Sequence, residues 1–544
     1  MKKLLYILPF LFLIISCSSL KKEKVDLIVK NATVYTVDQK FRKADAFAVK
    51  DGKFKEVGKE KNILQKYSPD SILDMEGKYI YPGFIDPHCH FYGYSMNLTE
   101  VDLSGTQSFE AIIEKLKDYN KKNEVEWLVG RGWDQNKWEE KQFPDKSRLD
   151  KTFPNTPVYL TRIDGHAAIV NSKALEIAGI NPQTEVSGGK VLKENNEPSG
   201  VLIDNAMSLV SDNIPKPTKE EQINALQKGE RNCFNVGLTM VADAGLKYAP
   251  THLLDSLQKA GKLKMNTYVM LTPTQDNIDT FVKQGVYKTE KMHIQSIKLF
   301  ADGALGSRGA CLLKPYNDDP DNYGLLVSEP SKLRKISKIA YENNFQVNTH
   351  AIGDSANRLM LNIYSDILHQ KNDRRWRIEH AQVIHPDDFK LFGEYNILPA
   401  INSTHATSDM NWADERLGND RLKNAYAYKK LLDENDWLPN GSDFPVEDIN
   451  PLYGFYAAFA RKDLYGNPEN GFQTENALSR KEALKSMTIW AAKGCFQENE
   501  RGSIEAGKKA DFVVTAKDIM QAEESKVPHI NVKNTFINGE IVTK

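Results

Sequence analysis

The long middle part of the chain alternates between apolar runs and stretches with helical spacing. The apolar runs have the length and continuity of parallel strands that are buried on both faces. Helical patterns lie between many of them, as at 219–236, 331–344 and 355–369. The predicted strands are 79–90, 239–245, 266–272, 294–302, 345–350, 376–380, 397–402 and 437–443. Eight strands that alternate with helices predict an α/β fold, a (β/α)8 TIM barrel, over residues 81–502.

The spacing of the strands is uneven at one point. About 150 residues separate the first predicted strand from the second, which is too many for one crossover helix. We therefore expect an inserted subdomain at about residues 100–215.

Both ends of the chain are rich in short β patterns. Residues 25–80 include a predicted hairpin, in which Asp51 and Gly52 form the turn between two β-rich runs. Residues 503–544 have the same character. This arrangement predicts one small β-sandwich domain built from both termini.

The first residues differ from the rest. A short basic start precedes an apolar run over 4–15, which is shorter than a typical membrane span. The run ends in Ser16-Cys17-Ser18, which resembles the lipobox of a bacterial lipoprotein signal. We expect residues 1–17 to be a signal peptide with Cys17 as the lipidated residue; an ordinary secretory signal is the alternative. The expectation is an exported lipoprotein, anchored to a membrane by lipid and facing the periplasm or the cell surface.

The overall charge is balanced. Lys and Arg number 72 and Asp and Glu number 73, giving a net charge of -1, so the composition gives no reason to expect a nucleic-acid partner. The four other cysteines are too widely spaced to suggest a disulfide-built scaffold. The oligomeric state is not fixed by the sequence, and a homodimer is one option.

Ionisable residues gather at the ends of the predicted strands. These residues are His88, His90, Lys298, His350, His380 and Asp443. Active sites of (β/α)8 barrels lie at the C-terminal ends of the strands, so these side chains should converge on one mouth. His88 and His90 are two apart and therefore point to the same side of a strand, as metal ligands would. Cys89 between them should face the packing.

This constellation and its flanking words resemble the amidohydrolase superfamily, in particular the branch of metal-dependent amidases that includes N-substituted formamide deformylases. One matching word is Pro82-Gly-Phe-Ile-Asp-Pro-His-Cys-His90. The others lie at 131–134, 164–168, 298–307, 377–382, 404–406, 441–446 and 502–511. The resemblance covers essentially everything after residue 25. One departure is Asn402-Ser403, where the family usually has Gln-Pro.

The resemblance implies a role for each position. His88, His90 and Asp443 match ligands of a first metal ion, and His350 and His380 match ligands of a second. Lys298 matches a lysine that is carboxylated by CO2 and bridges both ions. Asp443 also matches the carboxylate that carries a proton to the leaving amine. Zinc suits these ligands, but other divalent metals bind them too, and one ion remains an alternative to two.

Several further residues are candidates for the site. His166 and His405 are candidate catalytic residues, and each could instead be a satisfied core histidine. Candidate substrate-binding residues are Trp133, Arg162, Asp302 and Trp412. We expect a hydrolase that acts on a carbon–nitrogen bond other than a peptide bond, with a small amide such as an N-acyl or N-formyl amine as substrate. Ester or cyclic-amide hydrolysis on the same centre, or an inactive binding lipoprotein, are the alternatives.

Overall fold

A sheet of seven parallel strands forms the centre of the molecule. The computed structural model describes residues 22–123 and 125–543. The strands, in spatial order, are β8 (Phe84–Cys89), β15 (Leu238–Leu246), β16 (Asn266–Leu271), β18 (Met292–Phe300), β19 (Gln346–Ala351), β20 (Arg377–His380) and β21 (Leu398–Ala400). The short β17 (Tyr287–Lys288) pairs antiparallel with β18. Every neighbouring pair in the series is parallel, so the predicted barrel is confirmed.

The eighth predicted strand, 437–443, is an irregular segment within the described chain. On one side the Ile401 N–H donates to the Pro439 carbonyl at 2.9 Å, and the Gly441 N–H donates to the Ile401 carbonyl at 2.9 Å. On the other side the Asp443 N–H donates to the His88 carbonyl at 2.8 Å. Pro439 has no N–H for a continuous ladder, and Asp443 adopts a left-handed φ of 62°. The segment thus closes the barrel between β21 and β8 without being a regular strand.

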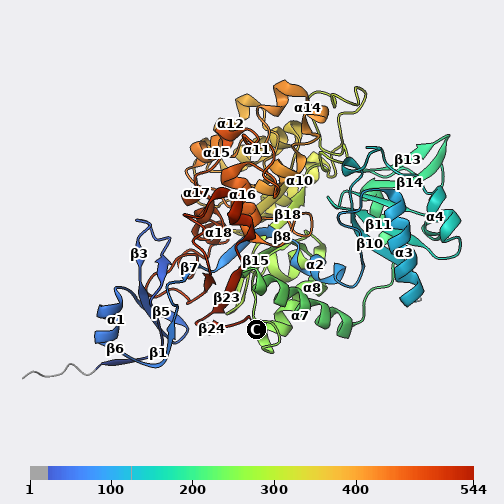
Figure 1. The fold of residues 1–544 in the computed structure, drawn as a ribbon. Helices are drawn as coiled ribbons and strands as arrows, with labels where there is room; N and C mark the ends of the chain where they lie inside the picture. The colour runs from blue at the N-terminus through green and yellow to red at the C-terminus, as the bar shows by residue number, and fades with distance from the viewer. Residues whose placement is uncertain (1–21, 124, 544) are drawn as a thin grey trace, which may run out of the picture.

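Helices cover the outside of the barrel (Figure 1). Three predicted helical stretches form α7 (Lys219–Asn235), α10 (Pro330–Glu342) and α11 (Asp354–Leu368). Thr218 and Glu221 form a reciprocal capping box at the start of α7, which satisfies free backbone N–H groups there. Pro330 begins α10, at a position where its missing N–H costs nothing.

Two sheets form the β-sandwich at the lower left of Figure 1. One has the order β5-β4-β1-β6 and the other β24-β23-β22-β7-β2-β3. From the N-terminal side come β1 (Glu23–Lys30), β2 (Thr33–Tyr35), β3 (Lys43–Ala44), β4 (Ala46–Lys50), β5 (Lys53–Gly58), β6 (Tyr67–Asp74) and β7 (Tyr79–Pro82); β22 (Phe512–Thr515), β23 (Val532–Ile537) and β24 (Glu540–Ile541) come from the C-terminal side. Phe47 packs on Phe512 at 5.1 Å between ring centroids, and Phe512 stacks on Phe536 at 4.2 Å. The core therefore joins the two ends of the chain, and the predicted β4–β5 hairpin turns at Asp51 and Gly52, both with positive φ.

The insertion after β8 forms a separate lobe at the right of Figure 1. Its sheet has the order β13-β14-β12-β11-β10-β9. The strands are β9 (Val101–Asp102), β10 (Leu128–Trp133), β11 (Val158–Arg162), β12 (Ala167–Val170), β13 (Gly189–Glu194) and β14 (Glu197–Asp204), with α3 (Phe109–Asn123), α4 (Ser147–Thr152) and α5 (Ser172–Ile177) beside them. Trp133 and Leu160 are fully buried in a core of this lobe.

The predicted signal peptide and Cys17 lie outside the described residues. Within residues 22–123 and 125–543, no helix combines the length and the apolar character that a membrane crossing needs.

Candidate metal centre

His88, His90 and Asp443 meet at the C-terminal mouth of the barrel. The Nε2 atoms of His88 and His90 lie 3.3 and 3.2 Å from Oδ1 of Asp443. The two histidines follow the period-2 alternation of β8 and its end. Cys89 faces the other way, is fully buried, and lies 3.5 Å from the Ala242 carbonyl through Sγ. Two imidazole nitrogens and one carboxylate oxygen thus face one point.

Lys298 and His380 adjoin this group. Nζ of Lys298, in β18, lies 3.0 Å from Nε2 of His88. The His380 ring, at the end of β20, lies 5.0 Å from the His88 ring. One potential ligand atom from each of His88, His380 and Asp443 falls within a mutual distance of 4.8 Å. The strand ends therefore bring together residues that lie more than 350 positions apart in the sequence.

His350 is the outer member of the cluster. Its ring lies 4.6 Å from the His380 ring. Its Nε2 lies 3.4 Å from the Gly303 carbonyl and 3.7 Å from Oδ1 of Asp302, so this nitrogen is turned towards the loop after β18. His350 is thus beside the centre but contacts it through His380.

Hydrogen bonds hold the far side of three imidazoles. Nδ1 of His88 lies 2.5 Å from Oε2 of Glu379, Nδ1 of His90 lies 2.9 Å from the Ala244 carbonyl, and Nδ1 of His380 lies 2.9 Å from Oδ1 of Asn402. Each partner is an acceptor, so Nδ1 carries the proton and Nε2 presents its lone pair on the opposite side of the ring, where a cation can bind. This arrangement is typical of metal-ligating histidines.

Glu379 is a functional residue that the sequence analysis missed. Its side chain is fully buried between His88 and Arg377, with Oε1 2.7 Å from Nε of Arg377. Simple strand alternation puts Glu379 and His380 on opposite faces, but His380 has a φ of 73°, which turns its side chain back to the mouth. The available signal was Arg377-Ile-Glu379: two opposite charges on the same face of a buried strand need a reason to be there.

The electrostatics of the cluster fit a cation. Burial lowers the pKa of His88 to about 4 and the pKa of His380 well below its usual range, so both imidazoles are neutral ligands. Burial opposes ionisation of Asp443, but His88 and His90 outweigh it and hold the pKa of this carboxyl well below its usual range. Among the described residues, the buried Oδ1 of Asp443 and Nε2 of His405 accept or donate no hydrogen bond. Neutral nitrogens, an ionised oxygen and unsatisfied buried atoms together suit a divalent metal.

His405 and His166, the two candidate catalytic histidines, also lie at the mouth of the barrel. His405, in α13 (Ser403–Asp409), lies with Nε2 3.9 Å from Oδ2 of Asp443. His166 comes from the insertion, and its ring lies 4.9 Å from the His350 ring. Nδ1 of His166 is 2.6 Å from Oδ1 of Asp204, a partner that nothing in the local sequence pattern indicates. The insertion therefore contributes to the same site as the barrel.

The four proposed substrate residues divide into two kinds. Arg162 and Trp412 line the cavity beside the metal residues. Trp133 does not, because it is fully buried and its Nε1 donates to the Leu160 carbonyl at 2.8 Å within the insertion. Asp302 is also fully buried and accepts the backbone N–H groups of Ile352 and Gly353. Among the described residues, neither Trp133 nor Asp302 lines the two cavities at the mouth, and both make contacts that hold the surrounding structure.

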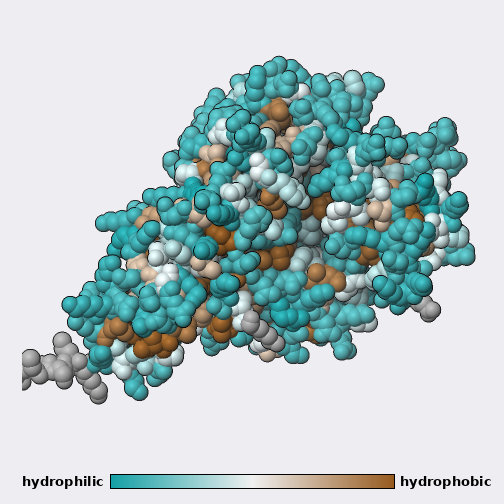
Figure 2. Space-filling model, viewed as in Figure 1, coloured by the Kyte–Doolittle hydropathy of each residue, from teal (hydrophilic) through white to brown (hydrophobic). Residues whose placement is uncertain are grey.

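Two adjoining cavities lead from the metal residues to solvent. The inner cavity, of about 90 Å³, is lined by the histidines, Asp443 and Arg162. The outer cavity, of about 800 Å³, lies between the insertion and the barrel. Five lining residues are common to both: Asp134, Lys137, Ile163, Val446 and Glu447. Figure 2 shows a mostly hydrophilic face with apolar side chains along the boundary between these two lobes.

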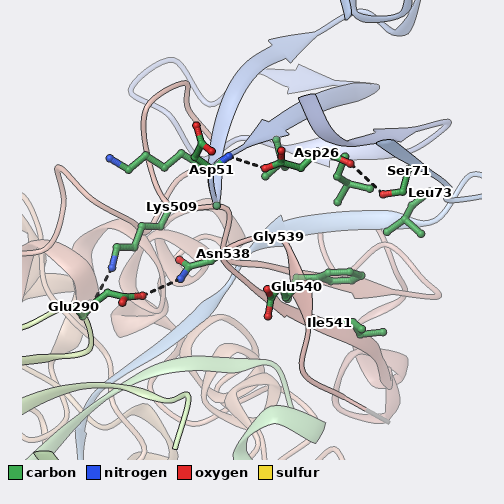
Figure 3. A pocket seen from close by; sticks show the side chains of 15 residues that line it. Asp26, Asp51, Ser71, Leu73, Glu290, Lys509, Asn538, Gly539, Glu540 and Ile541 are labelled. Carbon is green, nitrogen blue, oxygen red and sulfur yellow. Dashed lines mark hydrogen bonds between the residues drawn. The ribbon is translucent and has the colours of Figure 1, made fainter. Parts of the chain in front are cut away.

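Another hollow, of about 680 Å³, lies in the β-sandwich (Figure 3). Its charged side chains are held by local contacts: Lys509 Nζ donates to the Glu290 carbonyl at 3.0 Å, and Asp26 accepts the Asp51 N–H at 2.6 Å. None of the metal-cluster residues lines it. This hollow is therefore separate from the metal-cluster residues at the barrel mouth.

A parallel barrel whose strand ends gather histidines, a lysine and an aspartate defines the class of metal-dependent barrel hydrolases. A profile of the amidohydrolase family matches residues 71–543, and the chain belongs to this family. The chain is 32% identical over 535 residues to Protein LONG AFTER FAR-RED 3 of Arabidopsis thaliana, covering 95% of this chain and 91% of that one. It is 24% identical over 539 residues to N-substituted formamide deformylase of Arthrobacter pascens, covering 94% and 97%.

A solved structure agrees with the fold. It is the crystal structure of an uncharacterized metal-dependent hydrolase from Pyrococcus horikoshii, with a TM-score of 0.75 and 27% sequence identity, covering 92% of this chain and 99% of that one. The amidohydrolase expected from the sequence words is thus confirmed at the level of family and fold.

Proposed function

We propose that this chain hydrolyses a carbon–nitrogen bond of a small amide, an N-acyl or N-formyl amine, rather than a peptide bond. The observation that carries the proposal is the convergence of His88, His90 and Asp443 within 3.3 Å at the mouth of the barrel. The similarity to an N-substituted formamide deformylase supports an amide over an ester or a cyclic amide.

The proposed cofactor is zinc, as two ions. His88, His90 and Asp443 would hold the first, His350 and His380 the second, and carboxylated Lys298 would bridge them. Burial lowers the pKa of Lys298 to about 8, which favours the neutral amine that carboxylation requires. A bound divalent ion supplies an activated water at neutral pH and polarises the amide carbonyl.

The chain's own residues would then move the protons. Asp443 is ionised and can accept the proton of the attacking water and deliver it to the leaving nitrogen, a role typically worth about 10²–10⁴-fold in rate. His405, with Nε2 3.9 Å from Oδ2 of Asp443, lies beside this path. The contact with Asp204 holds the His166 ring facing the cavity, where it can bind the substrate.

We further propose that the protein is tethered to a membrane by lipid on Cys17 and acts outside the cytoplasm on small-molecule substrates. The support is the signal-like pattern of residues 1–17. Metabolic labelling with a fatty-acid analogue would test it, since a Cys17→Ser variant should lose the label.

Turnover of a panel of N-formyl and N-acetyl amines, amino acid amides and lactams tests the activity. Protein loaded with zinc should release free amine, and chelated protein should not until zinc is returned. Asp443→Asn should lower kcat by about 10²–10⁴-fold, whereas the exposed Asp414→Asn should not. If loaded protein hydrolysed esters but no amide of the panel, the proposed bond would be wrong.

A further inference from the structure

Two carboxylates beside the metal residues have no cationic partner. Within the described chain, neither Asp409 nor Glu447 has a Lys or Arg nitrogen within 4.0 Å. Asp409 accepts from the Tyr426 hydroxyl at 2.8 Å and from Gln382 Nε2 at 3.3 Å. Glu447 accepts from the Ser408 hydroxyl at 2.6 Å. We call Asp409 and Glu447 the acid pair.

Two other acids of the same cavity share one cation. Arg162 forms ion pairs with both Asp134 and Asp164. The charge of this arginine is therefore used within the protein. Lys137 also lines both cavities, but the lining of the inner cavity has five acids against Lys137 and Arg162, so an excess of negative charge remains there. A neutral hydrogen-bond donor stabilises a carboxylate less than a cation does.

The acid pair lies where the two cavities adjoin. Both residues line the inner cavity, and Glu447 also lines the outer one. His405 lines the same inner cavity, is 8% exposed, and has no hydrogen-bond partner for its Nε2 among the described residues. The inner cavity, at about 90 Å³, is much smaller than the outer cavity, at about 800 Å³. A substrate that extends from the metal residues into the outer cavity would pass the acid pair.

We propose that the acid pair selects amides that carry a positive charge, an ammonium or a guanidinium, a few bonds away from the bond that is cleaved. The cation would lie against Glu447 and Asp409 while the acyl group occupies the inner cavity. This inference rests on the proposed amide hydrolysis and names the substrate class of that site. Burial raises the pKa of Asp409 to about 7, as expected for a carboxylate that lacks a cation.

Three acetamides of similar length test the proposal. N-acetyl-1,4-diaminobutane is cationic, N-acetylpentylamine is neutral and N-acetyl-4-aminobutanoate is anionic. The assay is run at about pH 8, above the pKa of Asp409. There kcat/KM should be at least about tenfold higher for the cation than for the neutral analogue, and lowest for the anion. If the wild type had equal kcat/KM for the three acetamides, the proposal would be overturned, and no variant would be needed.

Variants assign the preference to the acid pair. Glu447→Gln and Asp409→Asn keep the hydrogen-bond acceptors, and each should reduce the preference for the cation by about tenfold, mainly through KM. The double variant should not distinguish cation from neutral analogue. Asp414→Asn, an exposed acid two residues after Trp412, should leave the preference unchanged. A double variant that folds and still prefers the cation would refute the assignment.

Calorimetry separates this inference from the proposed reaction. Zinc-free wild type should bind N-acetyl-1,4-diaminobutane more tightly than N-acetylpentylamine, and the double variant should bind them alike. If that pattern held while no amide was hydrolysed, the acid pair would stand and the proposed reaction would fail. If all three amides were hydrolysed at equal rates, the reaction would stand and the acid pair would fail.

Discussion

Replacing Glu379 by glutamine tests the support beneath the metal centre. The carboxylate lies between Nδ1 of His88, at 2.5 Å, and Nε of Arg377, at 2.7 Å. Burial opposes its ionisation, but Arg377 outweighs this and holds the pKa of Glu379 well below its usual range. Glu379→Gln keeps the shape and removes the charge, so it should affect both stability and metal binding.

The expected loss of stability follows from burial. Arg377 and Glu379 are both fully buried, and removing one partner of a buried pair typically costs about 3–5 kcal/mol because the remaining charge is uncompensated. Metal affinity should fall by about 10–100-fold, since the acceptor that orients His88 is weakened. Urea unfolding of zinc-free protein measures the first effect, and zinc titration against a competing chelator measures the second.

Two further variants make the test specific. Glu415→Gln removes an exposed acid that lies 2.9 Å from Lys141, and this change should cost no more than about 1 kcal/mol. The double variant Arg377→Met, Glu379→Leu removes both buried charges, so it should recover most of the stability but not the zinc affinity. A loss below about 1 kcal/mol in Glu379→Gln, or normal zinc affinity in the double variant, would refute this reasoning.

Two other predictions follow from single side chains. The Lys298→Ala variant should lose bound zinc, measured by elemental analysis, because the substitution removes the proposed bridging group. Added short carboxylic acids should partly restore zinc binding. Full activity with normal zinc content would exclude the bridging role. Burial, with the charge of Lys288, lowers the pKa of His293 to about 4. As the pH falls, the imidazole is therefore protonated in the unfolded chain before it is protonated in the folded protein. The free energy of unfolding should fall by up to about 3 kcal/mol between about pH 6.5 and about pH 4. His293→Gln should flatten urea unfolding curves against pH in that range, and the exposed His252→Gln should not.

The barrel, and the gathering of ionisable residues at its mouth, could be predicted from the sequence. The apolar runs marked seven regular strands, because buried parallel strands need continuous apolar sequence. Strands that run in parallel end at one mouth, so residues at those ends, such as Lys298 and His380, had to meet. The composite sandwich followed from β patterns at both termini.

The misses have physical causes. The role of Glu379 depends on the left-handed backbone at His380, which alternation cannot foresee. His166 and Asp204 both belong to the insertion, and the sequence of the insertion has no regular hydrophobic pattern from which their contact could be predicted. Trp133 and Asp302 were candidates for substrate binding, but sequence spacing does not tell which side chains face the cavity and which are satisfied by neighbouring backbone groups.

The irregular segment 437–443 forms a seam where the barrel closes against β8, and local unfolding at this seam would disturb the site. Asp443 and His88 stand on the two sides of this seam, joined by one backbone hydrogen bond of 2.8 Å. An ion held by both side chains would act as a cross-link between the first and last segments of the barrel, closing a loop of about 355 residues in the chain. Chelation of the ion would then remove this cross-link as well as the catalytic metal. The backbone amide hydrogens of Gly441 and Asp443 should therefore exchange with solvent before those of β16 or β18.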